Sequence, residues 1–245
     1  MSAVDVWLVD LAVSADQLDL CAQVLDRSER ERGNRFLRLE DRARFVASHA
    51  ALRLILAEAR ACSPSEIRLT ANAAGKPNLA APAGSAQAFN LSHSGTRALI
   101  GLGDSADIGV DIELIRPIPD AVRIARTHFA PDEAASLAKL PPHAVEPTFF
   151  GLWTRKEAVV KALGTGLSLP LNRFSVTLPP AAPRLLGNSA GWTLAAIEAG
   201  PGYAATVAVR AADIAFRHHR LSPDWPDRLG EKRANRACGP AKARL

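Results

Sequence analysis

The chain is short of cysteine and has no long hydrophobic run. Its three cysteines, Cys21, Cys62 and Cys238, are odd in number and widely spaced, which fits neither a disulfide framework nor a zinc site. No apolar stretch approaches the roughly 18 residues that a membrane helix needs, and the first ten residues lack the basic start of a secretory signal. The sequence therefore predicts a cytoplasmic protein that does not enter a membrane.

Positive charge is concentrated in one part of a chain whose composition is otherwise ordinary. Hydrophobic residues make up 48% of the 245 residues and charged residues 22%, which excludes a mostly disordered chain, a collagen-like repeat and a coiled coil. The formal net charge is only +5, yet seven arginines lie within residues 27–44. Such a segment suits an anionic partner, such as a phosphorylated ligand, an acidic protein or nucleic acid. A solvated arginine-rich helix has the same charge pattern, and charge alone favours it.

Hydrophobic periodicity predicts an α+β protein of two halves of similar size, each with a short, mainly antiparallel sheet and packed helices. Helices are expected at about 40–61, 119–128, 132–139 and 146–162, with a further helix after the capping box at Ser14. Strands are expected at 4–13, 67–70, 88–91, 97–102, 108–114, 174–178, 192–198 and 203–210. The predicted units are residues 1–107 and 108–222, followed by a basic, proline-containing, irregular tail over 223–245.

The segment Asp111-Ile112-Glu113 lies in an expected strand, where alternate side chains face the same way. Its two carboxylates would converge on one side of the strand. Paired oxygen ligands suit Mg²⁺, which usually keeps several waters and takes further oxygens from substrate phosphates. The pattern is short, and an exposed acidic strand face is its commoner explanation.

The expected helix over 146–162 places Trp153, Glu157 and Lys161 on one face, because they are spaced four residues apart. Glu157 could supply a third metal ligand, and Lys161 could hold a phosphate. An ordinary surface pair of glutamate and lysine beside a core tryptophan explains the same spacing.

The segment N-L-S-H-S-G at residues 90–95 places two hydroxyls and an imidazole at the end of an expected strand. Such groups, together with backbone N–H groups, can bind a phosphate. Lys76, in the segment G-K-P, could make a further phosphate contact. A polar turn explains both segments without a ligand. The chain has no Walker loop, and adjacent Ser and His residues are a poor guide to a protease.

The order and spacing of these segments resemble those of the phosphopantetheinyl transferases. The matching segments are G-K-P at 75–77, F-N-L-S-H-S-G at 89–95, I-G-V-D-I-E at 108–113 and L-W-T-R-K-E-A-V-V-K-A-L-G-T-G-L-S-L-P-L at 152–171. The resemblance runs from about residue 27 to residue 178, and it is to the longer, monomeric type that activates peptide and polyketide synthetases. It implies two similar α+β subdomains with pseudo-twofold symmetry and an active site in the cleft between them.

The resemblance implies an enzyme that moves 4'-phosphopantetheine from coenzyme A to a serine of an apo acyl, peptidyl or aryl carrier protein. Adenosine 3',5'-bisphosphate would be released, and Mg²⁺ would be required. Residues 1–107 would hold the nucleotide side of the coenzyme A site, and residues 108–222 would hold the metal and the catalytic residues. The expected protein is a cytoplasmic monomer that binds neither nucleic acid nor a membrane.

The resemblance also implies roles for individual residues. Mg²⁺ would be bound by Asp111, Glu113 and Glu157. Coenzyme A would be bound by Arg32, Arg44, Lys76, Ser92, His93 and Lys161, and by Asp111 through the metal. The proton of the carrier serine would pass to Glu157 or to a water held by the metal, with Glu133 as the second candidate and Lys161 assisting at the phosphates. Glu29 stands where the resemblance leads us to expect a basic residue.

Three other hypotheses fit part of the pattern. A Mg²⁺-dependent phosphodiesterase or nuclease would also use clustered acids and basic residues. A non-catalytic module that binds coenzyme A or an acidic protein would need no metal ligands, whereas all three acids are present. A nucleic-acid-binding protein is disfavoured, since the chain lacks a recognisable nucleic-acid module. The sequence does not indicate which carrier protein is the natural acceptor.

Overall fold

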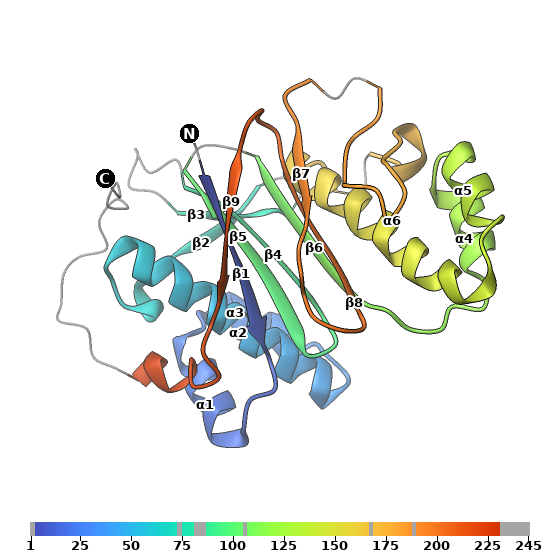
Figure 1. Cartoon of the computed structure of the whole chain (residues 1–245). Coiled ribbons are helices and arrows are strands. Elements are labelled where there is room, and N and C mark those ends of the chain that lie inside the picture. The colour runs from blue at the N-terminus through green and yellow to red at the C-terminus, as the bar shows by residue number, and fades with distance from the viewer. Residues whose placement is uncertain are drawn as a thin grey trace.

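The computed structural model describes residues 3–72, 75–80, 87–104, 107–166, 169–187 and 190–230. In chain order its elements are β1 (Ala3–Asp10), α1 (Ala15–Val24), α2 (Arg27–Gly33), α3 (Leu39–Arg60), η1 (Pro64–Glu66), β2 (Leu69–Ala71), β3 (Pro77–Leu79), β4 (Ala88–Ser94), β5 (Arg97–Gly103), β6 (Ile108–Leu114), α4 (Ala121–His128), α5 (Pro131–Leu137), α6 (Pro142–Leu163), η3 (Leu171–Arg173), β7 (Thr193–Ala196), β8 (Tyr203–Val209), β9 (Ala215–Arg220) and η4 (Asp227–Gly230). The α+β class is as the sequence predicts. Figure 1 shows the strands between two groups of helices, α1–α3 and α4–α6.

The first sheet takes its strands from both ends of the chain. Its order is β4-β5-β1-β9, and β1 is antiparallel to β5 but parallel to β9. The sequence analysis missed β9, because four of its six residues are polar and hide the alternation. Its residues 215–220 fall in the segment assigned to the second half. A bidentate ion pair between Arg217 and Asp5, at 2.9 and 2.7 Å, holds β9 beside β1.

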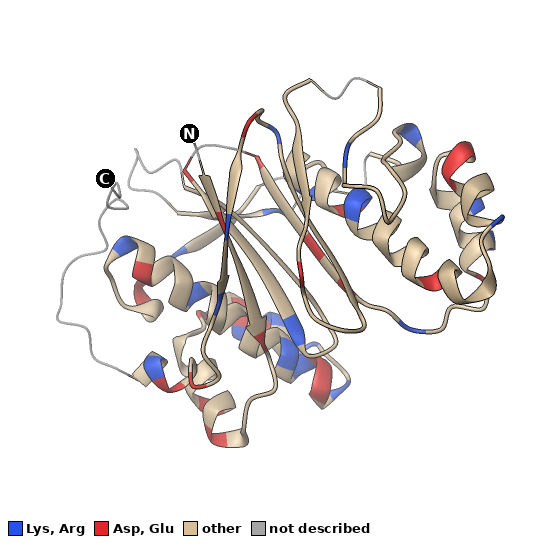
Figure 2. Cartoon of the chain, in the orientation of Figure 1, with Lys and Arg blue, Asp and Glu red and all other residues tan. Residues whose placement is uncertain are grey.

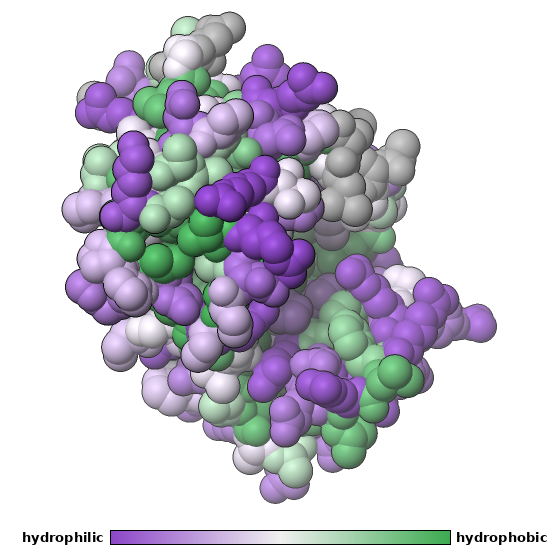
Figure 3. Space-filling view, turned by 90° about the vertical axis from the view of Figure 1, so that its right-hand side faces the viewer, coloured by the Kyte–Doolittle hydropathy of each residue, from purple (hydrophilic) through white to green (hydrophobic). Residues whose placement is uncertain are grey.

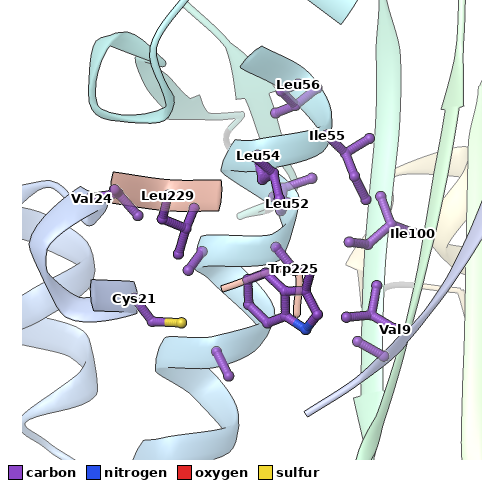
Figure 4. Packing of buried hydrophobic residues seen from close by; sticks show 14 of the residues in the cluster. Val9, Cys21, Val24, Leu52, Leu54, Ile55, Leu56, Ile100, Trp225 and Leu229 are labelled. Atoms are coloured by element: carbon purple, nitrogen blue, oxygen red, sulfur yellow. The ribbon is translucent and has the colours of Figure 1, made fainter. Parts of the chain in front are cut away.

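The main hydrophobic core lies between the first sheet and helices α1 and α3. Val9 and Ile100 contribute from the sheet, and Trp225 lies among them at 1% exposure (Figure 4). The Nε1–H group of Trp225 donates a hydrogen bond to the carbonyl of Asp10 at 3.1 Å. The expectation of an irregular tail is therefore wrong for residues 223–230, which close this core and contain η4. Proline excludes a regular strand there but permits the turn that presents the tryptophan.

The second half is a three-stranded antiparallel sheet, in the order β6-β8-β7, packed against α6. A turn at residues 200–202 joins β7 and β8. Helix α6 lies directly on β6, because Gly109 has no side chain to hold the two apart. A Cβ at this position would lie only 1.9 Å from the carbonyl oxygen of Ala158. This close approach places the polar face of α6 beside the acidic residues of β6.

The expected strand at 174–178 is wrong. In the described part of the chain, this segment makes only an isolated bridge between Val176 and Leu185. Pro179, Pro180 and Pro183 follow it and have no N–H group to donate. A second strand therefore cannot continue the pairing.

The surface mixes hydrophilic and apolar side chains. Figure 3 shows one face on which hydrophilic residues predominate and apolar residues form separate patches. Across the described ranges, the exposed large hydrophobic side chains are Phe36, Leu37, Leu39 and Leu186. None of the helices that the structure describes is both long and apolar enough to cross a membrane.

Replacing Trp225 with alanine tests whether the C-terminal turn closes the core. We expect Trp225→Ala to lower the free energy of unfolding by about 3–5 kcal/mol, because it removes a buried aromatic side chain. Urea unfolding followed by circular dichroism measures this change. Leu186→Ala, at a site that is 47% exposed, is the control and should change it by less than about 0.5 kcal/mol. Equal stability of Trp225→Ala and the wild-type chain would show that the turn is peripheral.

Candidate active site between the two sheets

Side chains rather than backbone groups join the two sheets where β4 meets β6. Asn90, Ser92 and Ser94 are alternate residues of β4 and therefore face the same way. They accept hydrogen bonds from backbone N–H groups of β6: Val110 to Asn90 at 2.8 Å, Ile112 to Ser92 at 3.4 Å and Leu114 to Ser94 at 3.1 Å. We call this row of contacts the seam. The alternative of a polar turn at 90–95 is wrong for residues 90–94, because they belong to β4 itself.

The seam also holds the two acids of β6. Ser92 donates its hydroxyl to Oδ1 of Asp111 at 2.9 Å, and Ser94 donates to Oε2 of Glu113 at 2.7 Å. Both carboxylates thus lie on the side that faces β4, as strand alternation predicts. Asp111 is only 3% exposed, so the alternative of an exposed acidic face is wrong for this residue.

Helix α6 brings a lysine and a third acid to the same place. The Nζ atom of Lys161 lies 2.6 Å from Oδ1 of Asp111 and donates to the hydroxyl of Ser92 at 3.1 Å. Burial raises the pKa of Glu157, and the nearby charges of Asp111 and Glu113 raise it further. Burial likewise raises the pKa of Asp111 and of Glu113, against the lowering effect of Lys161. Three carboxyl groups therefore share one poorly solvated, negatively charged region.

One carboxylate oxygen of this acidic group has no partner. The Oδ2 atom of Asp111 is buried and makes no hydrogen bond with any described residue. A buried oxygen of this kind is unfavourable unless a cation or a donor reaches it. The carboxyls of Asp111, Glu113 and Glu157 are the hard ligands that Mg²⁺ prefers. Among the described residues, however, no three potential ligands already lie close enough together to hold a metal ion.

A cavity of about 520 Å³ opens beside the acidic group. Lys76 and Asn90 line it from the first half of the chain, and Trp153, Glu157 and Lys161 line it from the second. Its volume lies within the range of small-molecule and cofactor sites. The cavity can therefore hold a ligand that both halves contact.

Lys76 is more constrained than its proposed phosphate contact implies. Its Nζ atom donates to the carbonyl oxygens of Ile108 and Ala162, both at 3.1 Å. These bonds tie the segment before β3 to the start of β6 and the end of α6. Burial lowers the pKa of this lysine. An ammonium group has three N–H donors, so one remains for a ligand in the cavity.

A basic group lies on the face of β4 opposite the seam. Burial lowers the pKa of His93, and the positive charges of Lys161, Arg44 and Arg32 lower it further. The guanidinium of Arg32 lies over the ring of Phe45, 5.3 Å from its centre. The structure thus brings together His93 and the two arginines that the sequence predicted. An anion bound here would relieve their mutual repulsion.

Glu133 makes structural contacts instead of joining the acidic group. Its carboxylate accepts hydrogen bonds from the backbone N–H groups of Ala130 at 2.9 Å and Val176 at 2.7 Å. It also pairs with Lys156 at 2.7 Å, and the two side chains are 2% and 0% exposed. These contacts tie α5 to α6 and to the segment after η3. They give no support to Glu133 as the second candidate for the general base.

Glu29 departs from the expected basic residue because it is part of a buried ion pair. Arg53, which is fully buried, lies 2.8 Å from Asp26 and 2.6 Å from Glu29. Its guanidinium also donates to the carbonyls of Pro64 and Ile67. The network fixes α2 against α3. Sequence reasoning missed Arg53, although the D-x-x-E capping box at the start of α2 could have identified Glu29 as structural.

The seam can be tested at Ser94, whose hydroxyl both donates and accepts. We expect Ser94→Ala to lower the free energy of unfolding by about 1–3 kcal/mol, because the N–H group of Leu114 loses its acceptor. Ser94→Thr keeps the hydroxyl and should recover most of the loss. Urea unfolding, with hydrogen exchange at Leu114, measures both effects. Equal losses in the two variants would mean that the hydroxyl does not hold the seam.

The partly buried imidazole of His49 makes the stability of the chain sensitive to acid. Burial lowers its pKa from 6.5 to about 3, and the charge of Arg32 contributes in the same direction. As the pH falls, the imidazole of His49 is therefore protonated in the unfolded chain before it is protonated in the folded chain. The free energy of unfolding falls as the pH drops from about 6.5 towards 3. We expect His49→Gln to reduce this loss by up to about 1.4 kcal/mol per pH unit. Urea unfolding at pH 7, 6 and 5 measures it, with the exposed His143→Gln as control; identical slopes in the two variants would contradict the assignment.

Comparisons with known proteins identify the family to which the chain belongs. A sequence model of the 4'-phosphopantetheinyl transferase superfamily matches residues 107–208, and a model of a 4'-phosphopantetheinyl transferase N-terminal region matches residues 12–102. The 4'-phosphopantetheinyl transferase HetI of Nostoc sp. is 35% identical over 207 residues, which are 84% of this chain and 87% of HetI. The 4'-phosphopantetheinyl transferase Sfp of Bacillus subtilis is 33% identical over 170 residues, 69% of this chain and 74% of Sfp. The Synechocystis sp. protein named "Putative 4'-phosphopantetheinyl transferase slr0495" is 38% identical over 150 residues, 61% of each chain. The chain therefore belongs to the 4'-phosphopantetheinyl transferase superfamily, the enzymes that transfer phosphopantetheine to carrier proteins.

Proposed function

We propose that the chain uses Mg²⁺ to transfer the 4'-phosphopantetheine group of coenzyme A to a serine of an apo carrier protein, with release of adenosine 3',5'-bisphosphate. Superfamily membership gives the transfer to carrier proteins; the metal, the second product and the residue roles are proposed here. The observation that supports them is the acidic group of Asp111, Glu113 and Glu157, with Lys161, beside a cavity lined by both halves.

Coenzyme A is strongly anionic, and the cationic side chains around the site are placed to bind it. His93, Arg44 and Arg32 form the basic group of the first half and would hold the nucleotide phosphate. Lys161 uses two of its three N–H donors on Asp111 and Ser92, so the third is free for the pyrophosphate. Lys76 would add its remaining donor from the opposite wall. Binding would then orient the pyrophosphate towards the acidic group.

The acidic group fits a divalent cation. Asp111 would offer its unpartnered Oδ2 atom, and Glu113 and Glu157 would complete the protein ligands. When bound there, Mg²⁺ supplies Lewis-acid polarisation of the phosphoryl group and neutralises the charge of the pyrophosphate. The seam keeps Asp111 and Glu113 in place, because each accepts a hydroxyl hydrogen bond from β4.

Glu157 is the proposed acceptor of the proton from the carrier serine. Its pKa is raised by burial and by the neighbouring carboxylates, which brings a carboxylate closer to the range useful to a general base near neutral pH. It lines the cavity, so its Oε atoms can face the incoming hydroxyl. Glu133 is not proposed for this step, since its carboxylate is fully engaged with Lys156 and two backbone N–H groups.

The acceptor is proposed to be an acyl, peptidyl or aryl carrier protein, and the enzyme to act as a cytoplasmic monomer. Two subdomains with pseudo-twofold symmetry are also proposed. Their support is the pair of helices α3 and α6, each of 22 residues and each packed on the sheet of its own half. The first unit would comprise residues 1–107 with β9 and η4 added, and the second would end before β9.

The transfer can be followed by intact-mass spectrometry of apo acyl and apo peptidyl carrier proteins incubated with the chain, coenzyme A and Mg²⁺. We expect a mass gain of one phosphopantetheine on the carrier, which is lost when Mg²⁺ is omitted and falls by at least about 100-fold in Asp111→Ala. Thermal unfolding gives a second readout, because Mg²⁺ that binds the folded chain raises its melting temperature. This rise should be absent in Asp111→Ala.

Other outcomes would point to other functions. Coenzyme A binding without any gain on several carriers would favour a non-catalytic module. Metal-dependent cleavage of a phosphodiester without coenzyme A would favour the phosphodiesterase. No binding of coenzyme A would contradict the proposed site itself.

A further inference from the structure

The turn between α2 and α3 exposes large apolar side chains. Leu37 is 101% exposed, Leu39 is 81% exposed and Phe36 is 38% exposed. The only other large hydrophobic residue that is exposed in the described ranges is Leu186, in the second half. Three of these four side chains thus fall within four consecutive residues. A concentration of this kind marks an interaction surface more often than isolated exposed residues do.

Unpaired arginines surround these side chains. Arg35, Arg38 and Arg42 are exposed, and none makes a side-chain hydrogen bond or ion pair with a described residue. Other arginines nearby are paired: Arg27 with its neighbour Glu31 at 2.7 Å, and Arg44 with two acids of its own helix. Figure 2 shows Lys and Arg interspersed with acidic residues on α3. The turn therefore presents free guanidinium groups together with apolar side chains.

The base of the turn is rigid. Phe36 packs on Phe45, with ring centres 5.3 Å apart. Helix α2 is fixed by the ion pairs of the fully buried Arg53 with Asp26 and Glu29. These contacts order the backbone that carries Leu37 and Leu39. Less conformational entropy of the turn is therefore lost when a partner binds.

The turn lies next to the basic group of the active site. Phe36 of the turn and the guanidinium of Arg32, in the basic group, both pack on the ring of Phe45, each 5.3 Å from its centre. Arg32 and Arg44 both lower the pKa of His93. Lys161 acts on the same imidazole. A partner seated on the turn would therefore lie near the coenzyme A side of the cleft.

We propose that the surface formed by Leu37 and Leu39 with Arg35, Arg38 and Arg42, here called the arginine–leucine turn, docks the carrier protein that accepts phosphopantetheine. This inference rests on the proposed function. The partner segment is acidic and amphipathic: its carboxylates pair with the free guanidinium groups, and its apolar residues cover the leucines. Complementary charge increases the rate of encounter, and the buried leucines slow dissociation.

The leucines are tested by steady-state kinetics with an apo acyl and an apo peptidyl carrier protein. Leu37→Glu/Leu39→Glu removes the apolar contact and repels an acidic partner, at positions where exposure makes a folding defect unexpected. We expect the KM for the carrier to rise by at least about tenfold, with the Kd for coenzyme A unchanged in calorimetry. Leu186→Glu, the same type of substitution at an exposed leucine of the other half, is the control and should leave both constants unchanged.

The arginines are tested by ionic strength. Arg35→Gln/Arg38→Gln/Arg42→Gln should slow association with the carrier and flatten its dependence on salt between 50 and 300 mM NaCl, about the range in which screening changes most. The variant should retain its Kd for coenzyme A. Unchanged carrier kinetics in both multiple variants, with an active wild-type chain, would overturn the docking surface and leave the proposed function intact.

The remaining outcomes are also decisive. If the wild-type chain loads no carrier, the proposed function fails. Calorimetric binding of the apo carriers to the wild-type and variant chains then tests the docking surface on its own. If the carriers bind equally to both chains, or to neither, the docking surface is overturned. A changed Kd for coenzyme A would assign the turn to the nucleotide site. Binding to phosphatidylserine vesicles that is lost in the leucine variant, with an unchanged KM for the carrier, would assign it to a membrane instead.

Discussion

The seam between β4 and β6 is the constraint on which the candidate active site depends. The N–H groups of Val110, Ile112 and Leu114 point away from β8, and without partners they would be unsatisfied at a buried edge. Asn90, Ser92 and Ser94 accept these bonds with side chains instead of backbone. The hydroxyls of Ser92 and Ser94 also donate to the acids of β6. The same side chains therefore join the two halves and hold the carboxylates in place. The halves cannot separate without disturbing the site.

Repulsion between like charges in the site destabilises the chain when no ligand is bound. Asp111, Glu113 and Glu157 are partly or wholly removed from water, and their charge is offset by Lys161 and, at Glu113, by Arg116. Burial of like charges costs free energy in proportion to how poorly they are solvated. On the other face of β4, His93 stands among cations. Strand β4 thus separates a region with excess negative charge from a region with excess positive charge. A bound anion would reduce the repulsion in the basic region, and a cation bound with it would reduce the repulsion in the acidic region.

Much of the fold, and the convergence of Asp111 and Glu113 on one side of β6, could be predicted from local pattern. The helices at 40–61 and 146–162 lie within a few residues of α3 and α6, and strand alternation placed Asp111 and Glu113 on one side. The family resemblance is confirmed by the comparisons. What the sequence hid were partnerships over long distances: the seam role of Ser92, the burial of Arg53, and the pairing of Glu133 with Lys156. Each involves a polar residue that is typical of a surface, and its burial depends on an element remote in the chain.

The position of β9 makes the first half depend on a segment that follows the second half in the chain. Its sheet begins with β1 but is completed only by residues 215–220, and its core is closed by Trp225. While the second half is still being translated, β1 lacks β9 as a neighbour and has a free edge. The core between the first sheet and helices α1 and α3 also lacks Trp225, its largest buried side chain. Unpaired edges and uncovered apolar surface attract other chains. The sheet and core of the first half are therefore completed only after the strands of the second half have been synthesised.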